Sequence, residues 1–186
     1  GDTILVHAAA GGMGLILCQW AKALGATIVG TVSTQEKAEV AKAAGCHFPV
    51  VRSEKSFVVV VREVTNNEGC AVVYEAIGKD TLQDSLDTLR PMGICAAYGH
   101  VSGPPDPVDI IQDLGRRGSL FITRPAIMHY VAKRADLEWT ARDLFKAIGD
   151  KVISANINYE YELKDAVQAH TAIESGKTLG ASVLIP

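Results

Sequence analysis

The sequence predicts an α/β fold: a doubly wound, six-stranded parallel sheet followed by a C-terminal appendage of helices and a strand. Runs rich in β-branched residues alternate with helical patterns over residues 1–125, as expected of βαβ units. A glycine-rich turn follows the first of these runs and precedes an apolar helical pattern. The composition shifts near Pro125, so we expect one domain over 1–125 and an appendage over 126–186.

Within the first domain, each expected strand is followed by a connection that returns the chain for the next one. Ser33 and Glu36 have the spacing of a capping box before the second helix, and Asp80 is suited to cap the fourth. The strands are expected at 3–8, 27–32, 48–51, 71–76, 93–98 and 119–123, and the helices at 12–24, 35–44, 57–64, 80–89 and 109–114.

Residues 57–64 are ambiguous, because the run Phe-Val-Val-Val-Val-Arg-Glu-Val is rich in β-branched residues that favour a strand. A parallel sheet nevertheless needs a crossover at this point to bring the chain back to its starting edge. We therefore expect a helix here, against local propensity.

The last third contains a long helical pattern over 126–148, with a break expected near 133–136. An extended segment at 159–163, a helix at 164–174 and a final strand at 181–185 follow. This part of the chain fits the two nucleotide-binding halves less neatly, which is why we treat it as an appendage.

Charge and composition exclude several classes of function. The net charge is −3 with an isoelectric point near 6.0, which argues against a nucleic-acid surface and a polybasic membrane patch. No apolar run is long enough to span a bilayer, and no export signal is present. The four cysteines are scattered without a C-x-x-C pair, so we expect buried thiols in a reducing cytoplasm and no metal site.

The segment Ala9-Ala10-Gly11-Gly12-Met13-Gly14 differs from the dinucleotide-binding pattern G-x-G-x-x-G only in its first position. Gly11 would let the backbone approach a pyrophosphate, and Gly14 would let the helix pack closely on the strand. Alanine serves at position 9 only if its φ is negative. With a strand before it and a helix after it, the segment predicts a Rossmann-type phosphate site, and a structural turn is the alternative.

The end of the second strand indicates which dinucleotide is bound. NAD-binding proteins place an acid about 20 residues after the glycines to bind the ribose diol, and none stands at 32–35. Ser33 can accommodate a 2′-phosphate, and Lys37 and Arg52 are cations within reach. We therefore expect NADPH, unless Lys37 and Arg52 are ordinary solvated charges. The missing acid also counts against a methyltransferase.

Other candidate ligand-binding residues follow the later strands, whose carboxyl ends share one edge of the sheet. Gly78 and Gly99 would allow a ligand close to the backbone. Tyr98 offers a ring face to a nucleotide, or packs in the core. His100 is suited to donate to a ribose or phosphate, or simply lies in a loop. His7, inside the first strand, is expected to be a core histidine with its hydrogen bonds satisfied.

Five stretches together resemble a known family. The chain is similar to the zinc-independent quinone oxidoreductases, the zeta-crystallin-like group of the medium-chain dehydrogenase/reductase superfamily. The stretches are "HAAAGGMGLILCQWAKALGATIVGTVST", "VVYEAIGKDT", "YGHVSG", "GSLFITRP" and "YELKDAVQAHTAIESGKTLGASVLIP".

The resemblance implies hydride transfer from NADPH to a quinone or related α,β-unsaturated carbonyl, with no metal. It implies that the pyrophosphate lies at Ala10, Gly11, Gly12 and Met13, the adenine side near Ser33, Lys37 and Arg52, and the ribose and nicotinamide near Tyr98, Gly99, His100, Thr123 and Arg124. It also implies a homodimer, for which residues 119–123 would supply an unpaired sheet edge. No acid or nucleophile in the sequence demands a catalytic role.

The sequence departs from the family in two ways. Arg52 stands where family members often have tyrosine or histidine, and these 186 residues do not include a counterpart of the N-terminal barrel that covers the substrate in the family. We therefore expect the 186 residues alone to bind NADPH with little or no turnover.

Three other functions share features with this sequence. A non-enzymatic dinucleotide-binding or redox-sensing module and an enoyl reductase of the same superfamily remain alternatives. A short-chain dehydrogenase would need the pattern Y-x-x-x-K, and Tyr130 is followed by Arg134 at that spacing.

Overall fold

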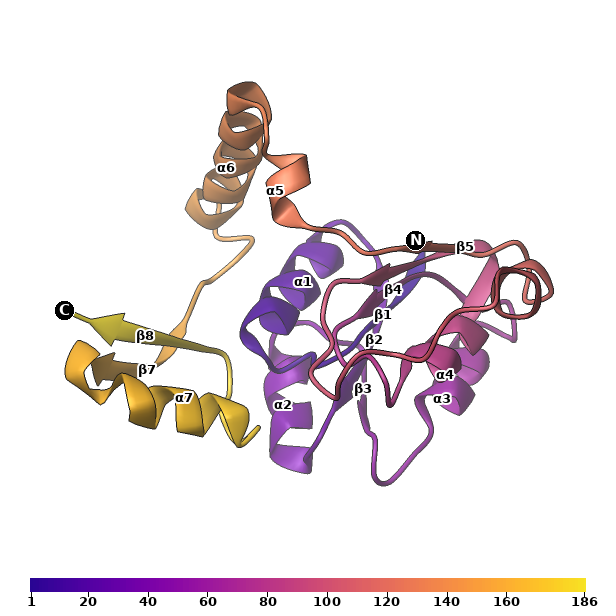
Figure 1. The fold of residues 1–186 in the computed structure, drawn as a ribbon, viewed down its shortest axis with the longest axis horizontal. Coiled ribbons are helices and arrows are strands. Elements are labelled where there is room, and N and C mark those ends of the chain that lie inside the picture. Colours follow the sequence, from indigo (N-terminus) through magenta and orange to yellow (C-terminus); the bar gives the residue numbers. More distant parts are fainter.

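A parallel sheet runs through the first 123 residues, in the order β3-β2-β1-β4-β5-β6 (Figure 1). The computed structural model describes residues 1–186. Strand order reverses between β1 and β4, so the carboxyl ends of these two strands flank the crevice where ligands bind in such folds. The predicted doubly wound sheet is confirmed. Its strands are β1 (Thr3–Val6), β2 (Thr27–Val32), β3 (Phe48–Val51), β4 (Cys70–Glu75), β5 (Leu89–Ala97) and β6 (Phe121–Thr123).

Helices cover both faces of the sheet and divide its core into two layers. On one face, α1 (Gly12–Ala23) and α2 (Gln35–Ala43) bury residues such as Cys18 and Ala38 against Ile28. On the other face, α3 (Phe57–Val64) and α4 (Leu82–Asp87) pack against the sheet. The π-helical turn η1 (Ile110–Gly115) packs on the same core. Each helix thus removes one apolar stripe from water.

The valine-rich segment 57–64 is a helix, as the crossover argument predicts. Phe57, Val60 and Val61 are buried, and Val64 packs against the same core. Because these positions share one helix face, burial compensates for the weak helix propensity of valine.

The first strand ends two residues earlier than predicted, because the backbone turns at Ala8. Ala8 has a φ of 51°, a left-handed conformation that breaks an extended chain. Ala9 is not among the positive-φ residues, and its N–H donates to the Thr31 carbonyl at 3.0 Å. Ala9 therefore meets the requirement for alanine at the first position of the pattern, which is that its φ is not positive. The left-handed residue is Ala8, one position earlier.

The capping box predicted before α2 is wrong. Thr34 occupies the cap position with extended backbone angles, and its hydroxyl accepts the Lys37 N–H at 3.3 Å. The cap lies one residue later than the Ser33–Glu36 spacing predicts, so Ser33 belongs to the connection between β2 and α2. The exposed Ser33 hydroxyl makes no hydrogen bond in the structure.

The cap predicted for α4 is also wrong. The helix begins at Leu82 rather than Asp80, with Thr81 at the cap position. The Thr81 hydroxyl donates to the buried Glu75 carboxylate at 2.9 Å instead of accepting from the helix. A tertiary hydrogen bond therefore replaces the local one that the sequence indicated.

The C-terminal third forms two groups of elements (Figure 1). The predicted long helix is divided at residues 131–133, slightly before the expected break, and it projects from the sheet. The second group packs beside α1 and α2, and no helix of the chain is long and apolar enough to cross a membrane. The elements are α5 (Ile127–Tyr130), α6 (Arg134–Gly149), β7 (Ile157–Glu162), η2 (Leu163–Asp165), α7 (Ala166–Glu174) and β8 (Ala181–Ile185), with β7 and β8 paired in parallel.

Gly14 sets how closely α1 approaches the end of β1. A Cβ at this position would lie 2.3 Å from the Ala8 carbonyl oxygen and 2.7 Å from the Ala9 Cα. We expect Gly14→Ala to lower the free energy of unfolding by about 2–3 kcal/mol, because the backbone must move apart to admit the methyl group. Urea denaturation measures the change.

The matched control is Gly149→Ala. Gly149 ends α6, and nothing lies within 4 Å of a Cβ added there. Alanine should leave stability unchanged or raise it by less than about 1 kcal/mol. If the Gly14 variant were as stable as the control variant, close helix packing would not be the role of this glycine.

Candidate functional site

The glycine turn, residues 8–14, places the N-terminus of α1 at the carboxyl end of β1. Gly11 precedes the helix with φ −80° and ψ 170°, and its N–H donates to the Ala8 carbonyl at 2.9 Å. The N–H groups of Gly12, Met13 and Gly14 have no acceptor within the helix, and no acidic side chain occupies its first turn. The turn therefore presents donors and the positive end of a helix dipole to an anion.

The candidate residues Ser33, Lys37 and Arg52 lie at the same edge, after β2 and β3. The Arg52 N–H donates to the Val32 carbonyl at 3.1 Å, which brings the end of β3 beside the end of β2. Ser33 and Arg52 are exposed, and the Lys37 ammonium donates to the Gly176 carbonyl at 2.6 Å. Two cations and a hydroxyl thus accompany the glycine turn, with no acid among them.

Gly78 and Gly99 follow β4 and β5, where the structure shows why neither has a side chain. A Cβ on Gly78, whose φ is 94°, would lie 2.5 Å from the Gly103 carbonyl oxygen. A Cβ on Gly99 would lie 2.4 Å from the Ala76 carbonyl oxygen. These glycines let two turns of the protein approach each other, and their proximity to a ligand stays a prediction.

His100, Thr123 and Arg124 meet at the ends of β5 and β6. The Arg124 guanidinium donates to the Ala97 carbonyl at 3.0 Å and lies 3.4 Å from Nδ1 of His100. Thr123 is the exposed last residue of β6. The structure thus gathers the later candidate residues in a second group on the carboxyl edge, across the switch point from the glycine turn.

Glu75, which sequence reasoning missed, is completely buried at the end of β4. Its Oε1 accepts the N–H of Ile77 at 2.7 Å, the N–H of Gly78 at 3.1 Å and the Thr81 hydroxyl at 2.9 Å. Its Oε2 accepts the Ser85 hydroxyl at 2.5 Å. Four donors thus surround a carboxylate that no lysine or arginine contacts. The sequence did contain one sign of this residue: Glu75 is a single acid at the end of an apolar strand, directly before Ala-Ile-Gly.

His7 is a satisfied core histidine, as predicted, and it extends the Glu75 network. Its Nδ1 is 2.8 Å from the Thr31 hydroxyl, and its Nε2 is 2.8 Å from the Ser85 hydroxyl. The Glu75 Oε2 lies 3.4 Å from Nε2, and the Phe57 ring packs edge-on at 5.0 Å. Burial lowers the pKa of His7 to about 4, outweighing the opposing effect of Glu75. His7 is therefore a neutral imidazole at pH 7. Its contact with Glu75 belongs to a hydrogen-bond network and is not an ion pair.

The direction of each hydrogen bond in the network follows from its chemistry. A carboxylate only accepts, so Ser85 donates to Glu75 and is left to accept from His7 Nε2–H. Nδ1 of the neutral ring must then accept from the Thr31 hydroxyl. One continuous chain of donors runs from Thr31 on β2 to Glu75 on β4.

Three other groups near the sheet have raised pKa values. Burial raises the pKa of Tyr98 to about 12 and, with Glu75 as a secondary cause, the phenol keeps its proton. Burial likewise raises the pKa of Cys70 to about 11 and that of Cys95 to about 12. All four cysteines are free and buried, as expected. No group of three or more His, Cys, Asp or Glu side chains is placed to hold a metal ion.

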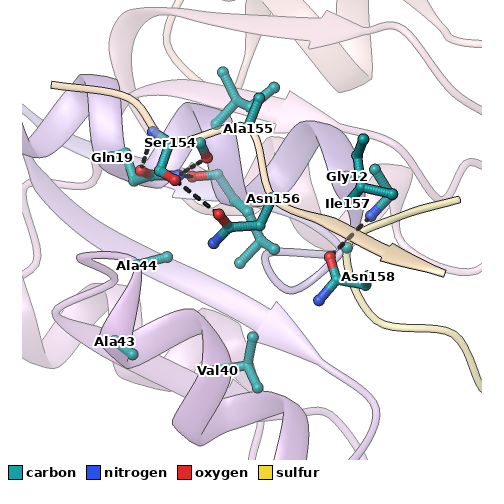
Figure 2. Close-up of a pocket in the computed structure, with 14 residues that line it drawn as sticks. Gly12, Gln19, Val40, Ala43, Ala44, Ser154, Ala155, Asn156, Ile157 and Asn158 are labelled. Carbon is teal, nitrogen blue, oxygen red and sulfur yellow. Dashed lines mark hydrogen bonds between the residues drawn. The ribbon is translucent and has the colours of Figure 1, made fainter. Parts of the chain in front are cut away.

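A mainly apolar cavity of about 380 Å³ lies between α1, α2 and the segment leading into β7 (Figure 2). Gln19 bridges its two sides: its amide oxygen accepts the Ser154 N–H at 2.8 Å, and its amide nitrogen donates to the Ser154 carbonyl at 3.2 Å. Gly12 is the only predicted site residue that lines it. The cavity thus lies behind the glycine turn, where the C-terminal group packs on the sheet domain.

Comparisons with known proteins agree on one family. The profile of the zinc-binding dehydrogenase family matches residues 12–136. A 2-haloacrylate reductase from Burkholderia sp is 51% identical over 186 residues, and a quinone oxidoreductase from Salmonella typhimurium is 43% identical over 187. The crystal structure of Escherichia coli quinone oxidoreductase complexed with NADPH superposes with a TM-score of 0.94 at 41% identity.

These relatives are longer than the chain. The matches cover all of it, but only 56% of the haloacrylate reductase and 57% of each of the two quinone oxidoreductases. The chain thus spans little more than half the length of the proteins it resembles.

The low pKa of His7 makes stability depend on pH. The unfolded histidine takes up its proton near pH 6.5 and the folded one near pH 4, so falling pH favours the unfolded state between these values. From pH 7.5 to pH 5, we expect a loss of about 2 kcal/mol from this group. Urea denaturation of wild type and His7→Gln should show a smaller pH dependence in the variant. An equal dependence in both proteins would contradict the assignment.

Proposed function

Because the chain belongs to the zinc-binding dehydrogenase family, we propose that it binds NADPH and serves a reductase that transfers hydride to a quinone or a related α,β-unsaturated carbonyl. The main support is the carboxyl edge of the sheet, where the glycine turn stands beside Ser33, Lys37 and Arg52 without an acid. An acid there would repel a 2′-phosphate, whereas cations and a hydroxyl attract it. The NADPH complex of the E. coli relative supports the same cofactor.

In this proposal the two groups of candidate residues bind opposite ends of the cofactor. The free N–H groups of Gly12 and Met13, with the backbone of Ala10 and Gly11, cradle the pyrophosphate. Ser33, Lys37 and Arg52 take the 2′-phosphate, which requires Lys37 to exchange the Gly176 carbonyl for the phosphate. The ribose and nicotinamide lie near Gly78, Tyr98, Gly99, His100, Thr123 and Arg124.

The bound dinucleotide supplies the hydride, and the chain positions it. A quinone that accepts a hydride and a proton becomes a hydroquinone, and NADPH becomes NADP⁺. No side chain of the site is assigned to proton transfer, because the network of Glu75 and His7 is sealed from solvent.

A second candidate acceptor is a 2-haloacrylate. The Burkholderia relative that bears this name has the higher identity, at 51%. Both acceptors contain a C=C bond made electron-poor by a conjugated carbonyl or carboxyl group, so both suit hydride addition. An enoyl reductase uses the same chemistry, and a non-enzymatic dinucleotide-binding module would lack it.

We also propose that residues 126–186 form a unit separate from the sheet domain of residues 1–125 and pack against further protein. The support is a set of large apolar side chains left exposed on α5 and α6. Such uncovered surface is typical of an interface. The residues are Ile127, Met128, Tyr130, Trp139 and Phe145, each at least 63% exposed.

Two further proposals concern assembly and location. β6 is the edge of the sheet, as predicted, and its unpaired backbone suits pairing with a second copy in a homodimer. The four free, buried thiols suit a reducing cytoplasm.

Titration calorimetry with NADPH and NADH tests the cofactor. We expect NADPH to bind at least about tenfold more tightly, because the 2′-phosphate gains charge-assisted hydrogen bonds. Arg52→Ala should weaken NADPH binding about tenfold and leave NADH binding within about twofold. Lys55→Ala, which removes a nearby cation paired with Glu63, is the matched control and should change neither. Tighter binding of NADH would contradict the proposal.

Oxidation of NADPH in the presence of 1,4-naphthoquinone or 2-chloroacrylate then separates the candidate activities. The acceptor with the higher kcat/KM identifies the substrate class. Binding without oxidation by either acceptor is the result expected of the 186 residues alone. The same result in a chain that also contains a substrate-covering domain would indicate a binding module.

Light scattering on a sizing column tests the dimer. We expect the wild type to have the mass of two chains, and Phe121→Lys, on the β6 edge, to shift it toward one because a charge blocks strand pairing. Leu24→Lys, which alters an equally apolar exposed position after α1, should leave the mass unchanged. A wild type with the mass of a single chain would rule out this assembly.

A further inference from the structure

Two turns at the carboxyl edge are joined through their backbones. The first follows β4 (residues 76–81), and the second follows β5 (residues 98–103). Three successive carbonyl oxygens, of residues 75, 76 and 77, accept hydrogen bonds from the second turn. The bonds are Tyr98 N–H to Glu75 at 3.0 Å, Gly99 N–H to Glu75 at 3.2 Å, Val101 N–H to Ala76 at 3.3 Å and Ser102 N–H to Ile77 at 2.8 Å.

The side chain of Glu75 organises the first of these turns. Its Oε1 holds the N–H groups of Ile77 and Gly78, which would otherwise be buried without acceptors, and binds the Thr81 hydroxyl as well. It is the only acidic side chain of the chain that is buried. A charged acceptor makes each of these bonds shorter and stronger than a neutral one would.

The other carboxylate oxygen is fixed by the network behind it. Ser85 donates to Oε2 from α4, His7 directly after β1 donates to Ser85, and Thr31 on β2 donates to His7. The carboxylate therefore cannot rotate without breaking a buried chain of hydrogen bonds, so its position is set before any ligand arrives.

We propose that Glu75 is a positioning residue for the nicotinamide end of the cofactor. The inference rests on the proposed function, which puts that end of NADPH at Gly78, Tyr98, Gly99 and His100. The Glu75 carboxylate fixes the first turn, and the second turn is held by four backbone hydrogen bonds, two to the Glu75 carbonyl and two to the first turn. Glu75 thereby sets the surface on which the nicotinamide lies, without touching it.

A purely structural role for Glu75 would affect every ligand alike. The adenine half of the site, formed by the glycine turn with Ser33, Lys37 and Arg52, takes no hydrogen bond from Glu75. The fragment 2′,5′-ADP carries the adenine and the 2′-phosphate and lacks the nicotinamide. Comparing its affinity with that of NADPH therefore distinguishes positioning of one end from general destabilisation.

Calorimetric titration of the purified protein with NADPH and with 2′,5′-ADP tests the inference. For Glu75→Gln, which keeps the size and removes the charge, we expect NADPH affinity to fall about tenfold and 2′,5′-ADP affinity to stay within about twofold. Ser85→Ala, which frees one carboxylate oxygen, should show the same selectivity with a smaller loss. Ser85→Ala also serves as the second variant if Glu75→Gln does not fold.

Thr88→Val is the matched control, because Thr88 is a buried hydroxyl just after α4 that does not contact Glu75. It should leave both affinities within about twofold. Equal losses for the two ligands in Glu75→Gln, or no loss for either, would overturn the positioning role. If wild type bound neither ligand, the proposed function itself would fail, and this inference with it.

Discussion

The interior of the sheet domain depends on one buried carboxylate and the donors that surround it. Glu75 ends β4 and accepts a hydrogen bond from Ser85 on α4, and its network extends to His7, directly after β1, and to Thr31 on β2. An uncompensated charge in such a place would be costly, and the four hydrogen bonds remove most of that cost. The donor chain therefore ties three strands and one helix to a single geometry at the switch point.

The rest of the carboxyl edge is shaped by close backbone approach. Gly14 allows α1 to meet the end of β1, while Gly78 and Gly99 allow two turns to pack directly on each other. In each case a methyl group would lie under 3 Å from backbone atoms, which cannot move aside as a side chain can. The candidate site is thus made largely of main chain, as suits the recognition of phosphates and a planar ring.

The C-terminal part of the chain contacts the sheet domain beside the glycine turn and Lys37. The Gly180 N–H donates to the Ala10 carbonyl at 3.0 Å, and Lys37 donates to the Gly176 carbonyl. The segment before β7 meets α1 through Gln19 (Figure 2). The helices α5 and α6, by contrast, leave apolar side chains in solvent.

Residue patterns along the chain were sufficient to predict the order of the elements, the parallel sheet and the glycine turn. The helix at 57–64 followed instead from the need for a crossover between parallel strands, against the local preference of its valines for a strand. Residue patterns were insufficient for the helix caps, where Thr34 replaced Ser33, and for Ala8, whose left-handed φ no short-range signal marks. Only the tertiary structure revealed Glu75. Its partners lie up to ten residues away along the chain, and the His7 and Thr31 that complete the network are further still, so no sequence window contains them together. Burial turned an acid that looked unremarkable in sequence into the residue around which the site is built.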